Sequence, residues 1–316
     1  MILFAQDSGL NKMNTKVLVI GGSGFLGSHV ADELTSAGHD VTIYDKKESP
    51  YLQKNQRMII GDILDTQKLQ QSIKEVDIVY HFAGIADILT AQENPVDTVR
   101  NNILATAYIL EFCKQSNIDR FVFSSSIYVY SDKGTFYRTS KQASELLIEN
   151  YSEVYDLDFT ILRFGSLYGR RANDFNYIYS AIKQAFTEGK IVRKGDGREI
   201  RDYVNVLDAA RASVKILDEE YKNSYVMVTG VQTMKVADIL SMIKEMLNNS
   251  IDIIYTAEEI EGHYEITPYS FKPRLAKKLI LDYHYDLGQG ILDCVYDTYK
   301  QLSQQGFPII IDKLNK

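Results

Sequence analysis

The sequence predicts an α/β fold, in which a doubly wound parallel sheet is followed by a smaller, mixed α/β lobe toward the C-terminus. Two observations support this prediction. Short, continuously apolar runs alternate with helical stretches up to Gly169, and the pattern becomes more irregular after that residue. Apolar runs of this kind are typical of strands that are buried on both faces of a parallel sheet.

The expected elements follow one another in strand and helix pairs. Strands are expected at residues 16–21, 41–44, 57–60, 78–82, 121–124 and 159–162, and helices at about residues 25–37, 65–74, 96–116 and 138–155. Further on, helices are expected near residues 174–188, 206–219, 235–247 and 288–304, with a turn at 195–197, an extended segment at 199–204 and a strand near 224–228. Strands that alternate with helices of this length predict right-handed β-α-β connections.

The 316 residues are expected to form two lobes that pack as one unit, because no Pro-rich or Ser-rich linker separates them. Residues 1–12 are expected to be a disordered tail. The larger domain is assigned residues 13–169 together with 205–229, and the smaller lobe residues 170–204 and 230–316.

Charge and composition exclude several classes of protein. The net charge of −7 argues against a general nucleic-acid binder, although a few local basic residues could still bind an anion. The two cysteines, Cys113 and Cys294, form neither a metal-binding spacing nor a disulfide framework, which favours a reducing, cytoplasmic setting. No apolar run is long enough to cross a bilayer, and the first residues lack the features of a signal peptide. We therefore expect no metal, no membrane and no nucleic-acid partner.

A glycine-rich turn joins the first expected strand to the first helix. Gly21, Gly24 and Gly27 give the spacing G-x-x-G-x-x-G. In a Rossmann-type domain such glycines allow a sharp turn, a close approach of backbone N–H groups to a pyrophosphate, and tight packing of the helix on the sheet. The turn alone is a weak signal, but the flanking strand and helix supply the required context. The predicted cofactor contacts in this turn are Gly21, Ser23, Gly24, Phe25, Leu26 and Gly27.

Two acidic residues follow the next strands. Asp45 ends the second strand, where a carboxylate can accept hydrogen bonds from the ribose hydroxyls of NAD and repel the 2′-phosphate of NADP. The alternative is a solvated loop acid, and Lys46 and Lys47 could weaken the preference for NAD. Asp62 could lie at the adenine edge, or it could cap the helix that begins near Asp65.

A serine cluster, a tyrosine and a lysine are candidates for catalysis. Ser126 closes a strand, and Tyr137 and Lys141 lie four residues apart, on one face of a helix. A lysine charge near a tyrosine hydroxyl stabilises the phenolate, so the tyrosine can act as a base, while Ser126 can hydrogen-bond the reacting oxygen. The spacing Y-x-x-x-K also arises by chance in a chain with 22 tyrosines, but the preceding serine cluster makes that less plausible here.

On these motifs, residues 13–305 resemble the extended short-chain dehydrogenase/reductase family, in particular its nucleotide-sugar epimerases and dehydratases. Further matching strings are residues 81–84, Asn102, residues 162–169 and residues 195–204. The resemblance implies NAD as cofactor, a nucleotide-diphosphate sugar as substrate, and a homodimer built on helices near residues 96–116 and 138–155. It adds Ile63, Phe82, Ala83, Gly84, Asn102, Tyr137 and Lys141 to the cofactor contacts and implies substrate contacts at Ser125, Ser126, Ser166, Arg201 and Arg274.

Arg201 matches the family's pyrophosphate-binding arginine, and a guanidinium fork suits a diphosphate. The alternative is a structural ion pair with Asp202 or Asp208. The chain also departs from the family. Only eleven positions separate Ser126 from Tyr137, where the family has about two dozen, and Ser166 replaces an asparagine. Arg274 is the candidate for a second nucleotide-binding arginine.

The residues after the catalytic serine help to choose between reactions. Family members that eliminate water or decarboxylate their substrate carry a carboxylate there, whereas this chain has Ser126-Ile127-Tyr128. The prediction is therefore an NAD-dependent epimerase that works through a transient keto sugar, at C4. A keto-sugar reductase that uses NADH or NADPH is the alternative, and a non-catalytic NAD-binding protein is a third possibility, which retention of Tyr137 and Lys141 disfavours.

Overall fold

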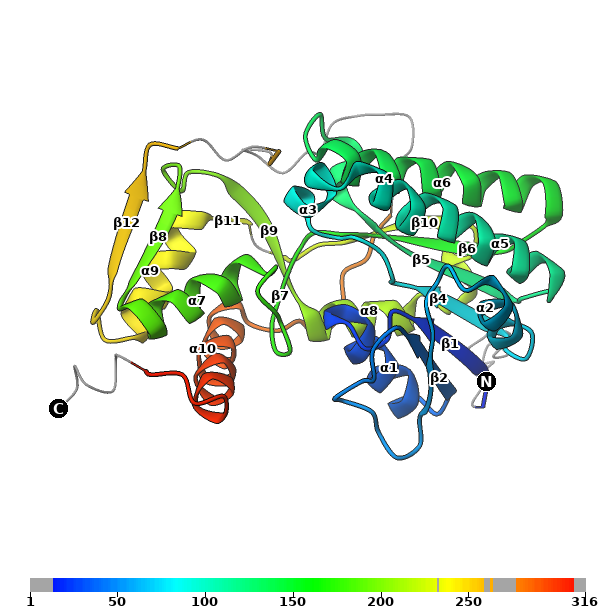
Figure 1. The fold of residues 1–316 in the computed structure, drawn as a ribbon, viewed down its shortest axis with the longest axis horizontal. Helices are drawn as coiled ribbons and strands as arrows, with labels where there is room; N and C mark the ends of the chain where they lie inside the picture. Colours follow the sequence, from blue (N-terminus) through cyan, green and yellow to red (C-terminus); the bar gives the residue numbers. More distant parts are fainter. Residues whose placement is uncertain (1–13, 232, 259–261, 264–276, 310–316) are drawn as a thin grey trace, which may run out of the picture.

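An eight-stranded, fully parallel sheet organises the larger domain, with the strand order β3-β2-β1-β4-β5-β6-β10-β13. The computed structural model describes residues 14–231, 233–258, 262–263 and 277–309. The strands are β1 (Lys16–Ile20), β2 (Asp40–Asp45), β3 (Arg57–Ile60), β4 (Ile78–His81), β5 (Arg120–Ser126), β6 (Phe159–Phe164), β10 (Ser224–Val228) and β13 (Lys277–Lys278). The predicted fold class is confirmed (Figure 1).

Helices cover both faces of this sheet. The main ones are α1 (Phe25–Ser36), α2 (Thr66–Ile73), α5 (Ala105–Gln115), α6 (Thr135–Tyr155) and α8 (Val206–Lys215). Val17 and Val19 of β1 pack into the core beneath α1 and α8, whereas Leu18 and Ile20 pack into the core beneath α2, α5 and α6. This alternation explains why β1 is apolar at every position, because a strand covered on both sides has no face left for polar residues.

The helix expected at residues 96–116 is continuous but not uniform. It consists of α4 (Pro95–Thr98), a π-helical turn η1 (Val99–Leu104) and α5. A short helix that was not predicted, α3 (Ile88–Glu93), precedes it. Single π-helical turns are frequent at functional sites, and here the turn carries Asn102.

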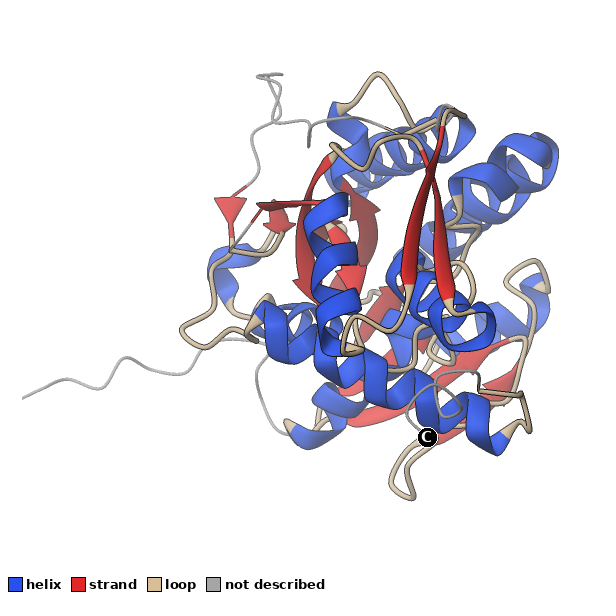
Figure 2. Cartoon of the chain, turned by 90° about the vertical axis from the view of Figure 1, so that its left-hand side faces the viewer, coloured by secondary structure: helices blue, strands red, loops and turns tan. Residues whose placement is uncertain are grey.

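The smaller lobe has its own apolar core, formed by α7 (Tyr177–Glu188), α9 (Val236–Met246) and α10 (Leu287–Gln304). Two small sheets complete it. One pairs β8 (Lys190–Lys194) with β12 (Asp252–Thr256), and the other has the order β11-β9-β7. Figure 2 looks onto this lobe.

The two lobes are joined by strands that leave the main sheet. β7 (Ser166–Tyr168) follows β6 after one residue, and β9 (Ile200–Asn205) leads directly into α8. β7 and β9 pair in parallel, and β11 (Thr233–Lys235) pairs with β9. The sequence analysis placed all residues after 229 in the smaller lobe, but β13 (Lys277–Lys278) lies in the main sheet.

No helix in the described ranges is long and apolar enough to cross a membrane.

Candidate functional site

The carboxyl ends of four neighbouring strands bring the predicted site residues to one edge of the sheet. Gly21 follows β1, Phe82 follows β4, Ser126 ends β5 and Ser166 begins β7 just after β6. Ligands of doubly wound sheets bind at this edge. The structure therefore brings together the glycine turn and the serine cluster, which lie about a hundred positions apart in the sequence.

The glycine turn has no room for side chains at two of its positions. A Cβ atom at Gly21, whose φ is +84°, would lie 2.5 Å from the nitrogen of Ala83. A Cβ atom at Gly27 would lie 2.2 Å from the carbonyl oxygen of Gly21. Gly24 is the N-cap of α1 and makes no side-chain cap, so the start of this helix suits a pyrophosphate. Phe25 and Leu26 pack their side chains against the core, so they would contact the pyrophosphate through their backbone.

Replacing Gly27 by alanine is expected to weaken NAD binding by about tenfold or more, roughly 1.4 kcal/mol. The added methyl group would push the start of α1 away from Gly21, because a backbone oxygen cannot move as a flexible side chain can. Titration of NAD by isothermal calorimetry measures the effect. Gly288→Ala, in α10, is the matched control and should bind NAD like the parent protein.

Asp45 is tied to the glycine turn. Its carboxylate accepts hydrogen bonds from the N–H groups of Ser23 (3.0 Å) and Lys47 (3.2 Å), and the Ser23 hydroxyl donates to the Lys47 carbonyl (2.8 Å). The end of β2 is thus held over the turn, where a ribose of a bound dinucleotide would lie. The contact of Asp45 with NAD stays a prediction.

The structure distinguishes the two roles considered for Asp62. Asp65 caps α2 by accepting a hydrogen bond from the Lys68 N–H (3.2 Å), whereas the Asp62 carboxylate accepts one from the Leu64 N–H (2.8 Å). The helix-capping alternative for Asp62 is therefore wrong, and its adenine contact stays a prediction. Ile63 packs its side chain into the core, which leaves little of it for the cofactor.

Asn102 is hydrogen-bonded to the turn after β4, and its expected contact with the cofactor stays a prediction. Its amide oxygen accepts a hydrogen bond from the Ile85 N–H (2.7 Å), and its amide nitrogen donates to the Ile85 carbonyl (2.9 Å) and the Ser140 hydroxyl (2.9 Å). A Cβ atom at Gly84 would lie 2.7 Å from the same amide oxygen. Asn102 therefore fixes the turn after β4, which contains Ala83 and Gly84, against α6.

Ser126, Tyr137 and Lys141 converge at the end of β5. Tyr137 and Lys141 are both buried on one face of α6. The Lys141 ammonium donates to the Ser124 carbonyl (2.7 Å) and lies 5.8 Å from the centre of the Tyr137 ring. Burial lowers the pKa of Lys141 to about 8, and Glu145 opposes this shift. The lysine thus stays largely cationic at neutral pH beside the tyrosine.

Ser125 differs from its neighbours in the cluster. Its hydroxyl donates to Glu145 (2.6 Å), which forms an ion pair with Arg163 (2.7 Å). These two charged side chains are 2% and 1% exposed. Successive side chains of a strand point to opposite faces, so Ser125 points away when Ser126 faces the site. The expected contact of the Ser125 hydroxyl with substrate is thus replaced by an internal hydrogen bond.

The residues expected to hold the nucleotide lie partly within the described structure. Ser166 is half-buried in β7, and Arg201 is buried in β9, where its guanidinium donates to the Ile200 carbonyl (3.1 Å). Of the two carboxylates considered as partners of Arg201, Asp208 pairs instead with Arg211 (2.8 Å). Arg274 lies outside the described residues.

Three side chains that no local motif marks complete this region: Tyr128, His263 and Arg193. His263 contacts the Tyr128 hydroxyl through Nδ1 (2.8 Å), and the Tyr128 ring packs edge-on against Tyr137, with centroids 6.2 Å apart. Burial lowers the pKa of His263, and the charges of Arg201 and Arg193 lower it further. His263 thus contacts the tyrosine end of the site, and the positive charges of two arginines of the smaller lobe act on it.

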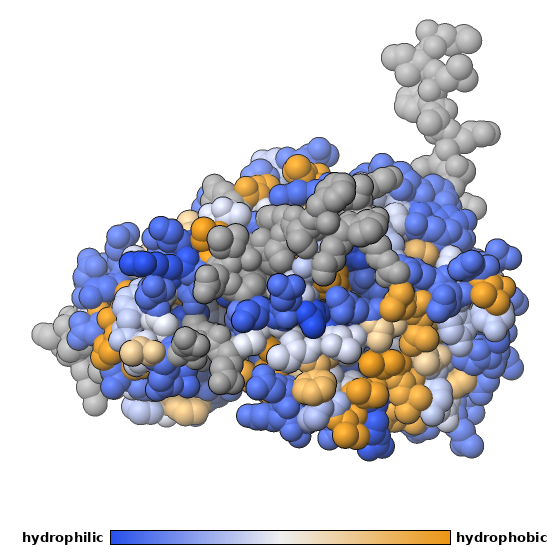
Figure 3. Space-filling view, turned by 90° about the horizontal axis from the view of Figure 1, so that it is seen from above, coloured by the Kyte–Doolittle hydropathy of each residue, from blue (hydrophilic) through white to orange (hydrophobic). Residues whose placement is uncertain are grey.

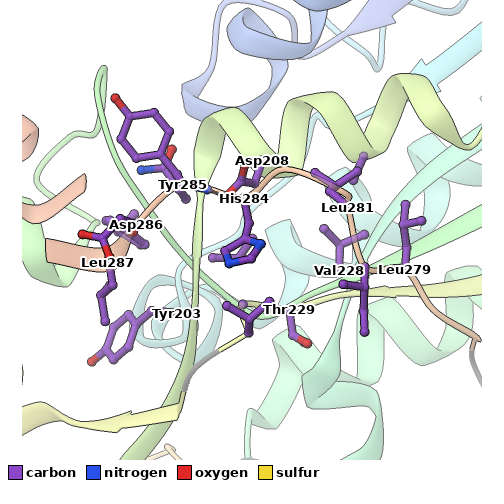
Figure 4. Close-up of a pocket in the computed structure, with 17 residues that line it drawn as sticks. Tyr203, Asp208, Val228, Thr229, Leu279, Leu281, His284, Tyr285, Asp286 and Leu287 are labelled. Atoms are coloured by element: carbon purple, nitrogen blue, oxygen red, sulfur yellow. Dashed lines mark hydrogen bonds between the residues drawn. The ribbon is translucent and has the colours of Figure 1, made fainter. Parts of the chain in front are cut away.

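A separate pocket lies between the ends of β9 and β10 and residues 279–287 (Figure 4). Tyr203, Thr229 and His284 are among the residues that line it. Neither the glycine turn nor Tyr137 lines this pocket. It therefore belongs to the junction of the lobes and not to the candidate site.

Comparison with known proteins identifies related chains. A model of the NAD dependent epimerase/dehydratase family matches residues 17–228. The chain is 30% identical over 262 residues to a putative UDP-glucose 4-epimerase of Methanocaldococcus jannaschii, covering 76% of this chain and 85% of that protein. It is 28% identical over 316 residues to a UDP-N-acetyl-alpha-D-glucosaminuronate decarboxylase of Bacillus cytotoxicus, covering 90% and 97%.

A similar solved structure is that of UDP-glucuronic acid 4-epimerase from Bacillus cereus in complex with UDP-glucuronic acid and NAD. The TM-score is 0.79 and the identity is 25%, over 91% of this chain and 100% of that one. The resemblance inferred from the motifs is thus confirmed over nearly the whole chain.

Proposed function

The chain belongs to the NAD-dependent epimerase/dehydratase family, and we propose that it is an NAD-dependent epimerase of nucleotide-diphosphate sugars that works at C4. The observation that carries the proposal is that Ser126, Tyr137 and Lys141 meet at the end of β5, at the sheet edge that also holds a glycine turn with no room for a side chain at Gly21 or Gly27. The UDP-sugars named for the relatives make UDP the first nucleotide to test.

Tyr137, Lys141 and Ser126 each have a separate role in the proposed reaction. NAD, when bound, takes a hydride from a sugar carbon and can return it to either face. Tyr137 accepts the proton of the sugar hydroxyl, and the Lys141 cation favours its phenolate form. Ser126 donates a hydrogen bond to the reacting oxygen. After the keto sugar has rotated in the site, Tyr137 returns the proton.

The substrate's diphosphate would bind at the smaller lobe. Arg201 is buried in β9, and its charge lowers the pKa of His263, as does the charge of Arg193, which forms an ion pair with Glu199 (2.8 Å). The buried guanidinium of Arg201 suits a diphosphate, because arginine binds phosphate oxygens in a bidentate way. Asp45 supports the choice of NAD over NADP.

The residues after Ser126 disfavour two other reactions of the family. Ile127 and Tyr128 begin the short helix η2 (Ile127–Tyr130), and neither carries a carboxylate. Elimination of water and decarboxylation in the family use a carboxylate in this stretch. Epimerisation needs none, so it remains the proposal although a decarboxylase is among the relatives.

The test is to incubate the purified protein with UDP-glucose, UDP-N-acetylglucosamine and UDP-glucuronic acid, and then with GDP-, CDP- and dTDP-sugars, without added cofactor. An epimerase regenerates its cofactor in each cycle, so we expect the C4 isomer to form. If no isomer forms and a 4-keto sugar instead consumes added NADH or NADPH, the protein is a reductase and the proposal is wrong.

We also propose a homodimer. Apolar side chains are exposed along α6 and the preceding helix, including Leu104, Leu146 and Val154. Figure 3 shows apolar side chains gathered on the half of the molecule that α5 and α6 occupy in Figure 1. The first of the two helices expected at the interface carries Val99, Ile103, Ala107 and Leu110 at helical spacing. Val99 is exposed, but Leu110 is buried in the domain's own core.

A Leu146→Glu, Val154→Glu double variant is expected to be a monomer in light scattering at micromolar concentration, where the parent protein is a dimer. Two charges in an apolar interface would remain without partners. Ile254→Glu, on an exposed position of β12, is the control and should remain dimeric. A monomeric parent protein would contradict the proposal.

The cytoplasmic setting likewise stays a proposal. Cys113 and Cys294 are buried free thiols, and burial raises the pKa of Cys294 to about 12. Free thiols of this kind suit a reducing compartment.

A further inference from the structure

Tyr128 and His263 form a hydrogen-bonded pair beside the catalytic tyrosine. The hydroxyl of Tyr128 lies 2.8 Å from Nδ1 of His263, and the two rings pack edge-on with centroids 6.2 Å apart. Tyr128 is also anchored to the catalytic serine, because its N–H donates to the Ser126 hydroxyl (3.3 Å). Tyr128 thus contacts both groups expected to hold the reacting oxygen, Ser126 through its backbone N–H and Tyr137 through its ring.

The backbone holds this pair in place from both lobes. The Gly134 N–H donates to the Gly262 carbonyl (2.9 Å), which joins the residue before His263 to the turn at the start of α6. A Cβ atom at Gly134 would lie 2.7 Å from the Tyr128 ring, so the ring packs directly on this turn. Ile85, Ile88 and Tyr137 form an apolar cluster around the other side of Tyr128.

The surroundings of His263 favour the neutral imidazole. Burial is the main cause of its lowered pKa, and Arg201 and Arg193 add to the effect, while Asp87 and Glu199 oppose it. The tautomer with its proton on Nε2 accepts the hydrogen bond of the Tyr128 hydroxyl at Nδ1. A neutral imidazole bonded to a phenol can accept a proton and return it.

We propose that Tyr128 and His263 form a second acid–base pair, which exchanges the proton on a carbon next to the transient sugar carbonyl with solvent. The proposal rests on the proposed function, because that function creates the keto sugar. A carbonyl acidifies the C–H bonds of both neighbouring carbons, and these carbons lie beside the oxygen that Ser126 and Tyr137 hold.

The step balances without a further reagent. The C–H bond breaks, its proton passes to the Tyr128–His263 pair, and its electron pair moves into the carbonyl to give an enolate. Ser126 and Tyr137 hydrogen-bond the enolate oxygen. The pair then exchanges its proton with water and delivers a solvent-derived proton to the same carbon, which restores the ketone. Delivery to the opposite face would invert that carbon.

The test uses a ready-made keto sugar, UDP-4-keto-6-deoxyglucose, with the parent protein in D2O. NMR and mass spectrometry follow deuterium at C3 and C5. We expect exchange well above the uncatalysed rate, reduced at least about tenfold in Tyr128→Phe and in His263→Gln. Tyr283→Phe, on an exposed tyrosine, is the control and should exchange like the parent protein.

No exchange above background by the parent protein would overturn the proposal, and so would undiminished exchange in both folded variants. Exchange of a ready-made ketone needs no hydride transfer, so this result is separate from the isomer assay. Exchange together with failure of every isomer assay would overturn the proposed function alone.

Discussion

Replacing Tyr137 by phenylalanine is expected to lower turnover by about 10²- to 10⁴-fold. In the proposed mechanism the Tyr137 hydroxyl moves a proton to and from the sugar, and phenylalanine keeps the ring near Lys141 and packed against Tyr128. NAD binding should persist, because the glycine turn and Asp45 are unchanged. The measurements are isomer formation under single-turnover conditions and NAD titration by calorimetry.

Tyr296→Phe is the matched control, since Tyr296 is an exposed tyrosine of α10. It should leave turnover at the parent value. Near-normal turnover of Tyr137→Phe would remove this residue from the mechanism, whereas loss of NAD binding would show that the ring or hydroxyl serves the cofactor instead.

Replacing Glu145 by alanine is expected to lower the free energy of unfolding by about 3–5 kcal/mol. Glu145 and Arg163 form an ion pair buried beneath the site, and Ser125 donates a hydrogen bond to the same carboxylate. The variant would leave the Arg163 charge buried without that partner. Urea unfolding followed by circular dichroism measures the change.

Two further variants test this explanation. Asp174→Ala removes one partner of an ion pair whose aspartate is 70% exposed, and it should change stability by less than about 1 kcal/mol. A Glu145→Met, Arg163→Met double variant removes both buried charges and should recover much of the lost stability. Equal losses in Glu145→Ala and the double variant would show that side-chain packing, and not the uncompensated charge, explains the effect.

The large sheet could be predicted from the sequence because its strands are apolar on both faces. The six strands from β1 to β6 end within two residues of their predicted bounds. In the smaller lobe the extended segment expected at residues 199–204 is β9, but β8, β11 and β12 were not predicted, for a physical reason. β8 reads Lys-Ile-Val-Arg-Lys, with charged residues at most positions of a half-exposed strand, and β11 has only three residues.

The site could be predicted only where its residues are close in the sequence. Gly21 to Gly27 and the pair of Tyr137 and Lys141 form local motifs, and the structure places them as such motifs require. Strand alternation places the side chains of Ser125 and Ser126 on opposite faces of the sheet, whereas the prediction gave both of them substrate contacts. The contact of Tyr128 with His263 joins residues 135 positions apart, and no local pattern encodes it.

The position of β13 has a consequence for how the protein is made. β13 extends the main sheet beyond β10, and Leu279 just after it is buried and donates its N–H to the Met227 carbonyl (3.1 Å). While a ribosome is still producing the residues between Val228 and Lys277, the edge of β10 stays open. Unpaired strand edges favour association with other chains. We therefore expect nascent chains stalled in this interval to depend on chaperones, whereas chains released after Leu279 can close the sheet themselves.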